Sequence, residues 1–422
     1  MAERAAPEGP RRGLTPRRPW RGRRVVLGVC GGIAAYKAVQ LARDLTQLGA
    51  EVDVVLTAAA ERFVGALSFA ALTGRPVRTD IFAADDALAH IRLAREAHAV
   101  CVAPATADFL ARAAHGRADD LLTAILLATR APVLLCPAMN DAMWAHPQTA
   151  ANVRHLREAL AYGVVEPAEG PLAHGEGQGA GRLPEPEVLT AWLGRVLEPA
   201  GPFAGRQVVV SAGPTRESLD PVRVLTNRSS GRMGFALAQA AWRRGAAVTL
   251  VSGPTSLPDP PGVNVVRVED TAAMAGAVRA ALPGAAALLM AAAPADFRPA
   301  EAAAAKTPKD AVPAALELVA TPDVLVSTRA ARPEGMVTVG FALQTGPDHA
   351  AARAKLAAKG LDLVVLNDAL EPGAGFEVDT NRVELLGADG SQESLPLLIK
   401  DEVAEAILDR VERLLPAAPA DA

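Results

Sequence analysis

The stretch Val25–Lys37, VVLGVCGGIAAYK, joins a short apolar run to a helix-like segment through two glycines. A continuous apolar run of this length is typical of a strand that is covered on both faces, as in a parallel sheet. Gly31 and Gly32 allow a tight turn and a close approach of the backbone to a ligand. A helix that begins near Ile33 would offer free N–H groups to a phosphate. Because the pattern is not G-x-G-x-x-G, the stretch fits either a phosphate site or a plain tight turn.

Strand-like and helix-like segments alternate from this stretch to about Leu193, and the alternation restarts after the Pro/Gly-rich linker LEPAGPFAGR (Leu197–Arg206). Alternation at this spacing predicts parallel sheets with right-handed crossovers. We therefore expect two tandem Rossmann-like three-layer α/β domains. The first is expected to be flavodoxin-like with a mostly parallel sheet, and the second to have a parallel sheet plus a small antiparallel addition. The expected boundaries are a disordered basic tail 1–22, a first domain 23–195, a linker 196–205, a second domain 206–415 and a tail 416–422.

Each domain has its own expected elements. In the first, the pattern predicts strands Val25–Cys30, Val52–Leu56, Val100–Ala103 and Val133–Cys136, and helices Ala34–Leu48, Glu61–Leu72 and Phe109–Thr129. In the second, it predicts strands Val208–Ser211, Val248–Val251, Val263–Val268, Leu288–Ala291, Val337–Phe341 and Leu363–Leu366, and helices Gly234–Arg244, Ala350–Lys359 and Glu402–Leu414. The antiparallel addition is expected to pair Arg382–Leu386 with Leu395–Ile399.

The composition excludes several classes of protein. The net charge of −4 gives no global basic field for nucleic acid, and no uncharged run reaches the roughly eighteen residues of a membrane span. Cys30, Cys101 and Cys136 lie in or beside apolar strand-like runs, which is no disulfide framework and favours a reducing cytoplasm. The first 24 residues carry eight arginines, no lysine and four prolines and lack the apolar region of a secretory signal. A disordered tail is expected there, with an organelle transit segment as the weaker alternative.

Polar side chains follow the expected strands of the first domain. Asn140 ends the strand in PVLLCPAMN, Thr106 follows the strand that ends in APAT, and Thr57 ends the second strand. The carboxyl ends of parallel strands are where open α/β sheets bind ligands. Taken singly, however, Asn140 fits a turn as well as a ligand site, and Thr57, Ser68 and His90 fit caps or surface groups.

The longest motif of the chain is SAGPTRESLDPVRVLTNRSSGRMG (Ser211–Gly234). A strand enters its first residues, where Gly213 allows close approach of the backbone. Ser229, Ser230 and Gly231 then open a helix, which suits anion binding. A generic α/β loop needs no such density of Asn, Arg, Ser and Gly, so we expect a second ligand site here.

Taken in order, GVCGGIAAYK, HIRLA, APATAD, HGRADDLL and PAMNDAMW resemble the homo-oligomeric flavin-containing cysteine decarboxylases. The long motif that begins at Ser211 resembles the phosphopantothenate–cysteine ligases almost residue for residue. Over nearly all of residues 24–415, the chain thus resembles the bacterial bifunctional phosphopantothenoylcysteine decarboxylase/phosphopantothenate–cysteine ligase family of coenzyme A biosynthesis. PAMN together with the histidine of HIRLA is specific to this group of flavoproteins.

For the first domain the resemblance implies FMN, held by Gly31, Gly32, Thr57, Ser68, Thr106 and Met139. In the family, FMN oxidises the CH2–SH group of 4′-phosphopantothenoylcysteine to a thioaldehyde, CO2 departs, and the resulting enethiol is reduced to 4′-phosphopantetheine. The flavin performs the redox step while the protein orients the substrate. By resemblance, His90 is the catalytic histidine and Asn140 holds the substrate carboxylate against the flavin.

The first domain departs from the family at its mobile flap. Where the family has Leu-Ala-Cys-Gly, this chain has LAHGEGQGAGRL, with His174 in place of the cysteine and one extra residue before Gly181. The family cysteine donates the proton that completes reduction of the enethiol. Two interpretations of His174 stay open: a replacement proton donor, since imidazole titrates near neutrality, or a passive loop residue.

For the second domain the resemblance implies a CTP-dependent ligase, in which the carboxylate of 4′-phosphopantothenate attacks the α-phosphate and the amine of cysteine then displaces CMP. Asn227 and Lys306 are the implied catalytic residues, and Mg²⁺ is the implied cation, with its ligands unknown. The implied CTP site comprises Ser211, Ala212, Gly213, Asp296, Lys306, Thr321, Pro322, Asp323, Val324, Phe341, Lys355 and Lys359. Taken alone, the Lys355–Lys359 pair is typical of a solvated helix face. Two substitutions depart from the family, Arg232 for a lysine and Gln344 for a glutamate.

The expected partners are 4′-phosphopantothenate, cysteine and CTP, with no nucleic acid and no membrane. The resemblance also implies a homo-oligomer built from trimers of the flavin domain and dimers of the ligase domain. Two alternatives stay open: an active ligase with an impaired or altered decarboxylase, and a flavin domain that serves as a regulatory binding module. His90 and Asn140 argue against the regulatory module, because binding FMN alone needs no such pair.

Overall fold

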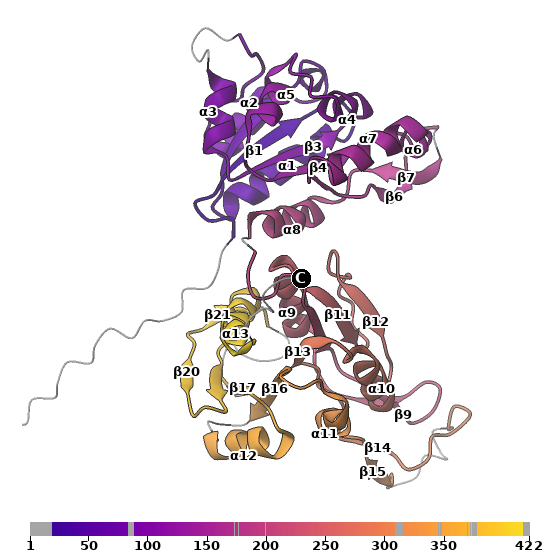
Figure 1. Ribbon diagram of the computed structural model, residues 1–422. Coiled ribbons are helices and arrows are strands. Elements are labelled where there is room, and N and C mark those ends of the chain that lie inside the picture. Colours follow the sequence, from indigo (N-terminus) through magenta and orange to yellow (C-terminus); the bar gives the residue numbers. More distant parts are fainter. Residues whose placement is uncertain are drawn as a thin grey trace, which may run out of the picture. The chain divides into compact units, whose positions relative to one another are not determined.

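The computed structural model describes residues 19–82, 88–172, 174, 175, 177–198, 200–308, 315–344, 346, 348–368, 370, 371, 373 and 378–416. The described residues divide into two compact units, 19–198 and 200–416. Both units are α/β structures with parallel strands at their centre (Figure 1).

The first unit is built on a five-stranded parallel sheet in the order β2-β1-β3-β4-β5. The strands are β1 (Arg24–Val29), β2 (Glu51–Leu56), β3 (Ala99–Ala105), β4 (Val133–Pro137) and β5 (Gly163–Val164). This 2-1-3-4-5 order is the flavodoxin-like one. The flavodoxin-like fold expected from the alternating pattern is therefore confirmed.

Helices cover both faces of this sheet. One face packs against α1 (Ala35–Gln47), α2 (Ala66–Thr73) and α8 (Pro186–Leu197), and the other against α3 (Ala89–Glu96), α4 (Ala107–Ala114), α5 (Leu121–Ala128) and α7 (Pro147–Glu158). Apart from Arg24, Glu51 and Asp53, the residues of these strands are apolar, as expected for a sheet that is covered on both faces. Between α7 and α8 an antiparallel hairpin of β6 (Ala168–Pro171) and β7 (Gln178–Arg182) follows β5.

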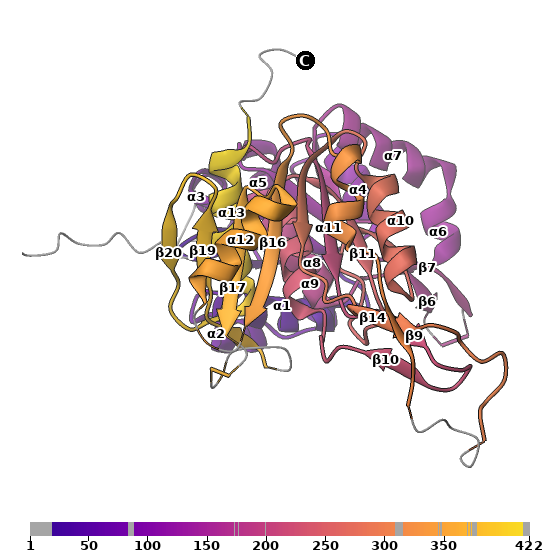
Figure 2. The same cartoon turned by 90° about the horizontal axis from the view of Figure 1, so that it is seen from below.

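The second unit contains an eight-stranded sheet in the order β12-β11-β8-β13-β16-β17-β19-β20. Its parallel strands are β8 (Gln207–Ala212), β11 (Ala247–Ser252), β12 (Asn264–Arg267), β13 (Ala285–Met290), β16 (Val337–Gln344) and β17 (Leu363–Asp368). Counted along the chain, their order is 3-2-1-4-5-6, which is that of the Rossmann fold. Antiparallel β19 (Glu384–Gly387) and β20 (Gln392–Ser394) extend the sheet beyond β17 (Figure 2).

Helices cover this second sheet as well. On one face α9 (Arg232–Arg243) packs with α13 (Lys400–Leu414). On the other lie α10 (Thr271–Ala281), α11 (Val324–Ser327) and α12 (His349–Lys359). The unit also has three short antiparallel strand pairs: β9 (Arg216–Ser218) with β10 (Val224–Thr226), β14 (Phe297–Pro299) with β15 (Leu318–Ala320), and β18 (Thr380–Asn381) with β21 (Leu398–Ile399). The expected parallel sheet with an antiparallel addition is confirmed.

Three expected elements are wrong in detail. The expected helix Glu61–Leu72 is instead a short 3-10 helix, Ala60–Arg62, followed by α2, because Gly65 has an extended backbone conformation between them. The single helix Phe109–Thr129 is instead α4 and α5, because Gly116 has a left-handed backbone conformation and Asp120 starts α5 with a capping box to Thr123. The expected antiparallel pair is wrong in its partners, since β19 pairs with β20 while β21 pairs with β18. Isolated apolar runs do not specify which neighbour a short antiparallel strand takes.

Candidate active sites

The candidate flavin residues of the first unit gather at the edge where its parallel strands end. Gly31 and Gly32 follow β1, Thr57 follows β2, Thr106 follows β3, and Met139 follows β4. Ser68 is exposed on α2, which comes after β2 in the chain. Because the strands are parallel, these segments share one edge, which is the ligand-binding edge of such sheets.

The two glycines of the first loop have different surroundings. A Cβ on Gly31 would lie 2.4 Å from the Cβ of Ala59, so this position must be glycine for packing. A Cβ on Gly32 would meet no atom within 4 Å. The next residue, Ile33, is 71% exposed, and α1 begins two residues later at Ala35. Gly32 and the start of α1 therefore leave an open surface at the sheet edge, where a phosphate group fits.

The two threonine hydroxyls make local hydrogen bonds. Thr57 Oγ1 donates to the carbonyl oxygen of Val29 (3.4 Å) and accepts from the Ala60 amide (3.2 Å). Thr106 Oγ1 accepts from the Phe109 amide (3.2 Å) and caps α4. Thr106 keeps its own O–H proton for donation to a ligand, whereas Thr57 is buried and its hydroxyl is already engaged.

Asn140 caps a helix and presents the rest of its amide group. Its Oδ1 accepts from the Ala142 amide (2.9 Å) and so starts α6 (Asp141–Ala145). This bond fixes the side chain and leaves the amide NH2 group as a donor. The turn-forming interpretation of Asn140 and the ligand-binding one are thus compatible, since the cap orients the NH2 group that a carboxylate would accept from.

His90 is the second residue of α3, near the edge where the strands end. Helices of this fold run antiparallel to the strands that they precede, so their first turn lies beside the carboxyl ends of the strands. Nδ1 of His90 is buried and has no hydrogen-bond partner among the described residues. A buried nitrogen without such a partner is unusual in a folded protein, and this one is available to a ligand.

The β6–β7 hairpin, which carries the flap sequence, is seated against the loop that contains Asn140. The Met139 amide donates to the carbonyl oxygen of Gly181 (3.0 Å), and a Cβ on Gly181 would lie 2.1 Å from Met139 O. His174 lies in the turn of this hairpin and is exposed. The hairpin therefore links the position of His174 to the Asn140 loop without burying the imidazole.

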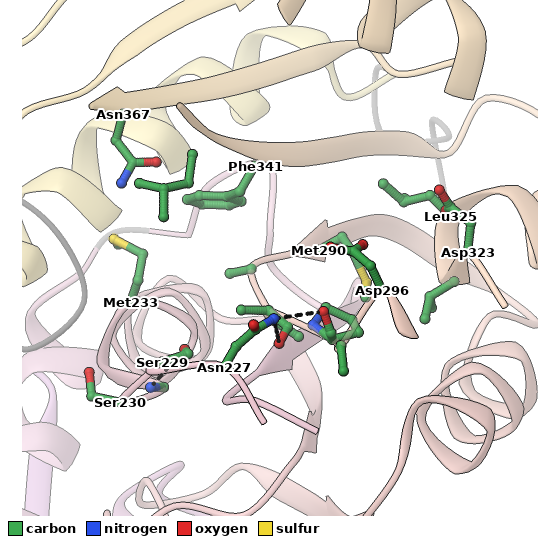
Figure 3. Close-up of a pocket in the computed structure, with 18 of the residues that line it drawn as sticks. Asn227, Ser229, Ser230, Met233, Met290, Asp296, Asp323, Leu325, Phe341 and Asn367 are labelled. Carbon is green, nitrogen blue, oxygen red and sulfur yellow. Dashed lines mark hydrogen bonds between the residues drawn. The ribbon is translucent and has the colours of Figure 1, made fainter. Parts of the chain in front are cut away.

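The second unit has a cavity of about 420 Å³ at the carboxyl ends of its central strands. Met290 of β13, Phe341 of β16 and Asn367 of β17 line it. The strand order reverses direction between β13 and its neighbour β8, so the cavity lies beside the usual ligand position of such sheets. Figure 3 shows Asn227 near its centre, Asp323 and Leu325 on one side, and Asn367 and Met233 on the other. The start of α9, with Ser229 and Ser230, forms part of the wall on the Met233 side.

Most candidate nucleotide residues line this cavity. They are Asn227, Asp296, Thr321, Pro322, Asp323, Val324, Phe341, Lys355 and Lys359. Ser211, Ala212 and Gly213 stand behind the wall: Ser211 is fully buried, and its Oγ accepts from the Ala292 amide (3.1 Å) while the carbonyl oxygen of Gly213 accepts from Ala293 (2.9 Å). Lys306 is exposed in the segment after β14 and does not line the cavity.

The lysine pair of α12 is tied to neighbouring groups. Lys359 Nζ forms a 2.5 Å ion pair with Asp323, which also caps α11, and Lys355 Nζ donates to the carbonyl oxygen of Phe341 (2.6 Å). Burial lowers the pKa of Lys355, and the nearby charge of Lys359 lowers it further. The pair faces the cavity, so the solvated-face interpretation of this spacing does not hold for Lys355.

Asn227 is held in place by two backbone carbonyls. Its Nδ2 donates to Ala293 O (3.1 Å) and Pro294 O (2.9 Å), as the dashed lines in Figure 3 mark. The side-chain oxygen remains as an acceptor at the centre of the cavity. Asn227 therefore joins the loop after β10 to the loop after β13 and also lines the cavity.

Comparison with known proteins gives two family matches. Residues 14–196 match the flavoprotein family, and residues 203–415 match the DNA/pantothenate metabolism flavoprotein C-terminal domain. Coenzyme A biosynthesis bifunctional protein CoaBC of Mycobacterium tuberculosis is 49% identical, covering 93% of this chain and 97% of its own. The Bacillus subtilis protein of the same name is 43% identical, again covering 93% and 97%. The chain belongs to this CoaBC family.

Membership of the CoaBC family makes the chain a bifunctional enzyme of coenzyme A biosynthesis, a decarboxylase and a ligase, as the motifs predicted. The crystal structure of a CoaBC C-terminal domain aligns over 51% of this chain and 98% of that domain, with 35% identity and a TM-score of 0.44. In the part of the chain that the structure describes, no helix has the length and apolar character of a membrane span.

Several residues that line the cavity were not predicted from the sequence. Asn367 lies near the end of β17, Asn381 lies in β18, and Lys400 is the first residue of α13. None of them stands in a motif, and Lys400 is about forty residues beyond the last one used. Gln344, which stands where the sequence resemblance expects a glutamate, has a buried Oε1 without a hydrogen-bond partner among the described residues and does not line the cavity.

Proposed function

We propose that the second unit joins cysteine to 4′-phosphopantothenate with CTP and that the first unit decarboxylates the product with FMN. The observation that carries the proposal is the placement of Asn140 and Asn227, each with a fixed amide at the carboxyl edge of its own parallel sheet. Asn140 offers its NH2 group to the carboxylate that is lost, and Asn227 offers its oxygen to the amine of cysteine that displaces CMP. The domain boundaries expected from the sequence, 23–195 and 206–415, belong to the same proposal.

In the first unit, Gly32, Ser68 and Thr106 contact FMN. Gly31, Thr57 and Met139 shape the loops of the same site. When bound, FMN supplies the two-electron oxidation that creates an electron sink for CO2 loss. The NH2 group of Asn140 holds the substrate carboxylate without adding a charge that would oppose its departure as CO2. His90 meets the substrate or cofactor through Nδ1, which has no partner among the described residues.

The fate of the enethiol depends on His174. His174 is exposed in the hairpin turn. If it delivers a proton to the enethiol, the product is 4′-phosphopantetheine. If no proton reaches the enethiol, the protein is the second candidate, an active ligase with an altered decarboxylase. We expect His174→Ala to raise the ratio of enethiol to 4′-phosphopantetheine about 10- to 100-fold, because general acid catalysis typically contributes at least that much. Mass spectrometry of turnover products measures the ratio.

His174→Cys is the matched variant, because it restores the family residue at the same position. It should give mainly 4′-phosphopantetheine. If His174→Ala and the unsubstituted protein release the same product mixture, His174 is a passive loop residue.

In the second unit, CTP occupies the cavity beside Asn227, with Asp296, Thr321, Asp323, Phe341 and the α12 lysines around it. Mg²⁺ enters with the phosphates, as Mg²⁺ is usually bound by one or two carboxylates plus substrate phosphates. Asp296 and Asp323 are the carboxylates among the described residues that line this cavity. The acyl-cytidylate then reacts with the amine of cysteine beside the Asn227 oxygen.

Lys306 lies on an exposed segment beside Asp220 and Arg223: the Thr307 amide donates to Asp220 Oδ2 (3.3 Å), and Arg223 donates to Thr307 O (2.8 Å). We propose that this segment closes over the cavity when CTP binds, so that Lys306 neutralises charge at the α-phosphate. Lys306→Gln should then lower the ligase kcat about 100-fold, as loss of one transition-state donor typically does. Flavin-dependent CO2 release from synthetic phosphopantothenoylcysteine serves as the control and should not change. A loss of both activities would contradict two separate sites.

The assembly is proposed to be a homo-oligomer, with flavin-domain trimers and ligase-domain dimers. Large apolar side chains near the flavin edge support it, since Ile33, Tyr36, Phe63 and Leu67 are all more than half exposed. Clustered exposed apolar groups mark protein interaction surfaces. The cytoplasm is the proposed location, because Cys30, Cys101 and Cys136 are buried free thiols.

A further inference from the structure

The Met233 side of the nucleotide cavity carries positive charge from two elements far apart in sequence. Arg232 opens α9, a helix of 12 residues, and Lys400 opens α13. Both residues line the cavity, and Lys400 is only 6% exposed. Lys400 Nζ donates to the carbonyl oxygen of Val378 (2.6 Å).

The opposite side of the cavity is less suited to a polyphosphate. Lys359 is paired with Asp323, Lys355 is bonded to Phe341 O, and Asp296 lines the same region. The negative charges of Asp323 and Asp296 offset the positive charges of the two lysines. Hydrogen-bond donors and acceptors are then both present on this side, which suits a base and a ribose. By charge, the phosphates therefore belong on the side of Arg232 and Lys400.

Asn381 gives an independent sign that a ligand completes this side. It is 4% exposed, lines the cavity, and its Oδ1 has no hydrogen-bond partner among the described residues. Asn381 of β18 pairs with Leu398 of β21, and β21 leads directly into Lys400, so this strand pair brings the two residues to the same side. A buried polar group without a partner is costly, and an amide can turn to donate to an anion.

We propose that Lys400 is a further substrate-contacting residue of the ligase site, where its ammonium binds the β- and γ-phosphates of the nucleotide. The inference rests on the proposed function and adds an orientation to it: the base lies toward Asp323 and the polyphosphate toward α9 and α13. Free N–H groups at the start of α9 contact the same phosphates, and Arg232, which is paired with Asp379, assists from the rim. Burial and Arg232 lower the pKa of Lys400, Asp379 raises it, and a bound polyphosphate would favour the charged form.

This position gives Lys400 a role in the first half-reaction. A carboxylate oxygen of phosphopantothenate forms a bond to the α-phosphorus, and the bond from that phosphorus to the bridging oxygen breaks. Pyrophosphate leaves with the electron pair of the broken bond, so negative charge grows on the group that Lys400 contacts. A cation there stabilises the departing charge.

The test compares CTP with CMP, which lacks the β- and γ-phosphates. Lys400→Gln in the full-length protein should weaken CTP binding about 10- to 100-fold, the effect of losing one charge-assisted hydrogen bond, and leave CMP binding unchanged. Calorimetric titration with each nucleotide and Mg²⁺ measures both. Lys400→Arg keeps the charge and should recover much of the CTP affinity. Arg410→Gln is the control on the same helix, because Arg410 pairs with Asp389 and does not line the cavity.

Three results would overturn the proposal. Equal losses for CTP and CMP would mean that Lys400 supports the fold rather than the phosphates, and unchanged CTP binding would mean that it touches neither. Normal pyrophosphate release without cysteine, followed by slow capture of cysteine, would assign Lys400 to the amino acid instead. Failure of the proposed function is distinguishable, because the unsubstituted protein would then bind neither nucleotide.

Discussion

Asn140→Asp should reduce CO2 release from phosphopantothenoylcysteine about 1000-fold while ligase turnover stays unchanged. The carboxylate of aspartate can still accept from the Ala142 amide and cap α6, so the local fold is retained. It cannot donate to the substrate carboxylate, and it places a like charge against it. Loss of one positioned donor alone costs roughly 100- to 1000-fold, and repulsion adds to that. Product formation is measured by mass spectrometry, with released FMN quantified to show that the cofactor still binds.

The outcome that would contradict this role is specific. If Asn140→Asp binds FMN and releases CO2 at more than about a tenth of the normal rate, the amide is only a helix cap. Asp141→Asn is the matched control, since Asp141 is adjacent on α6 and also accepts from the Ala142 amide. It should retain most of the decarboxylase activity.

Glu405→Ala should lower the free energy of unfolding of the second unit by about 3–5 kcal/mol. Glu405 on α13 is 2% exposed and forms ion pairs with Arg243 and Arg244 at the end of α9. Arg244 also pairs with Asp409 (2.8 Å) and Glu412 (3.1 Å). Removing the central carboxylate leaves two buried guanidinium groups with less negative charge, which is the most destabilising way to break such a cluster.

Calorimetry of the full-length protein measures the effect, with flavin release marking the unfolding of the first unit. Only the transition of the second unit should move to lower temperature. Glu334→Ala, which removes an exposed carboxylate of the same unit, should change stability by less than about 0.5 kcal/mol. A loss below about 1 kcal/mol for Glu405→Ala would show that the cluster is not needed to hold α9 against α13.

The sequence predicted the two sheets well because both consist of strands that are buried on both faces. Runs such as Val133–Pro137 are apolar from end to end. Glycines and polar residues mark where such strands end. The short antiparallel strands were predicted less well, because the pairing of β19 with β20 depends on tertiary contacts. The break between α4 and α5 was visible in principle, since Asp120 and Thr123 form a local capping box.

The site was predictable where one loop carries several functional residues. Asn227, Ser229 and Ser230 share one motif, and Thr321 to Val324 share another, so each group arrives at the cavity together. Lys400 and Asn381 reach it only because β18 and β21 pair, and local sequence does not encode that pairing. Ser211 shows the reverse case: it belongs to the motif, but its hydroxyl bonds to Met290 and the Ala292 amide behind the wall.

The central claim is that one chain carries two carboxylate-handling sites that act in sequence. Incubating the FMN-loaded protein with 4′-phosphopantothenate, cysteine, CTP and Mg²⁺ and following all species by mass tests it directly. The account predicts that phosphopantothenoylcysteine and CMP appear together and that the conjugate then loses CO2. Unchanged CTP and phosphopantothenate, or a conjugate that accumulates without losing CO2, would contradict it.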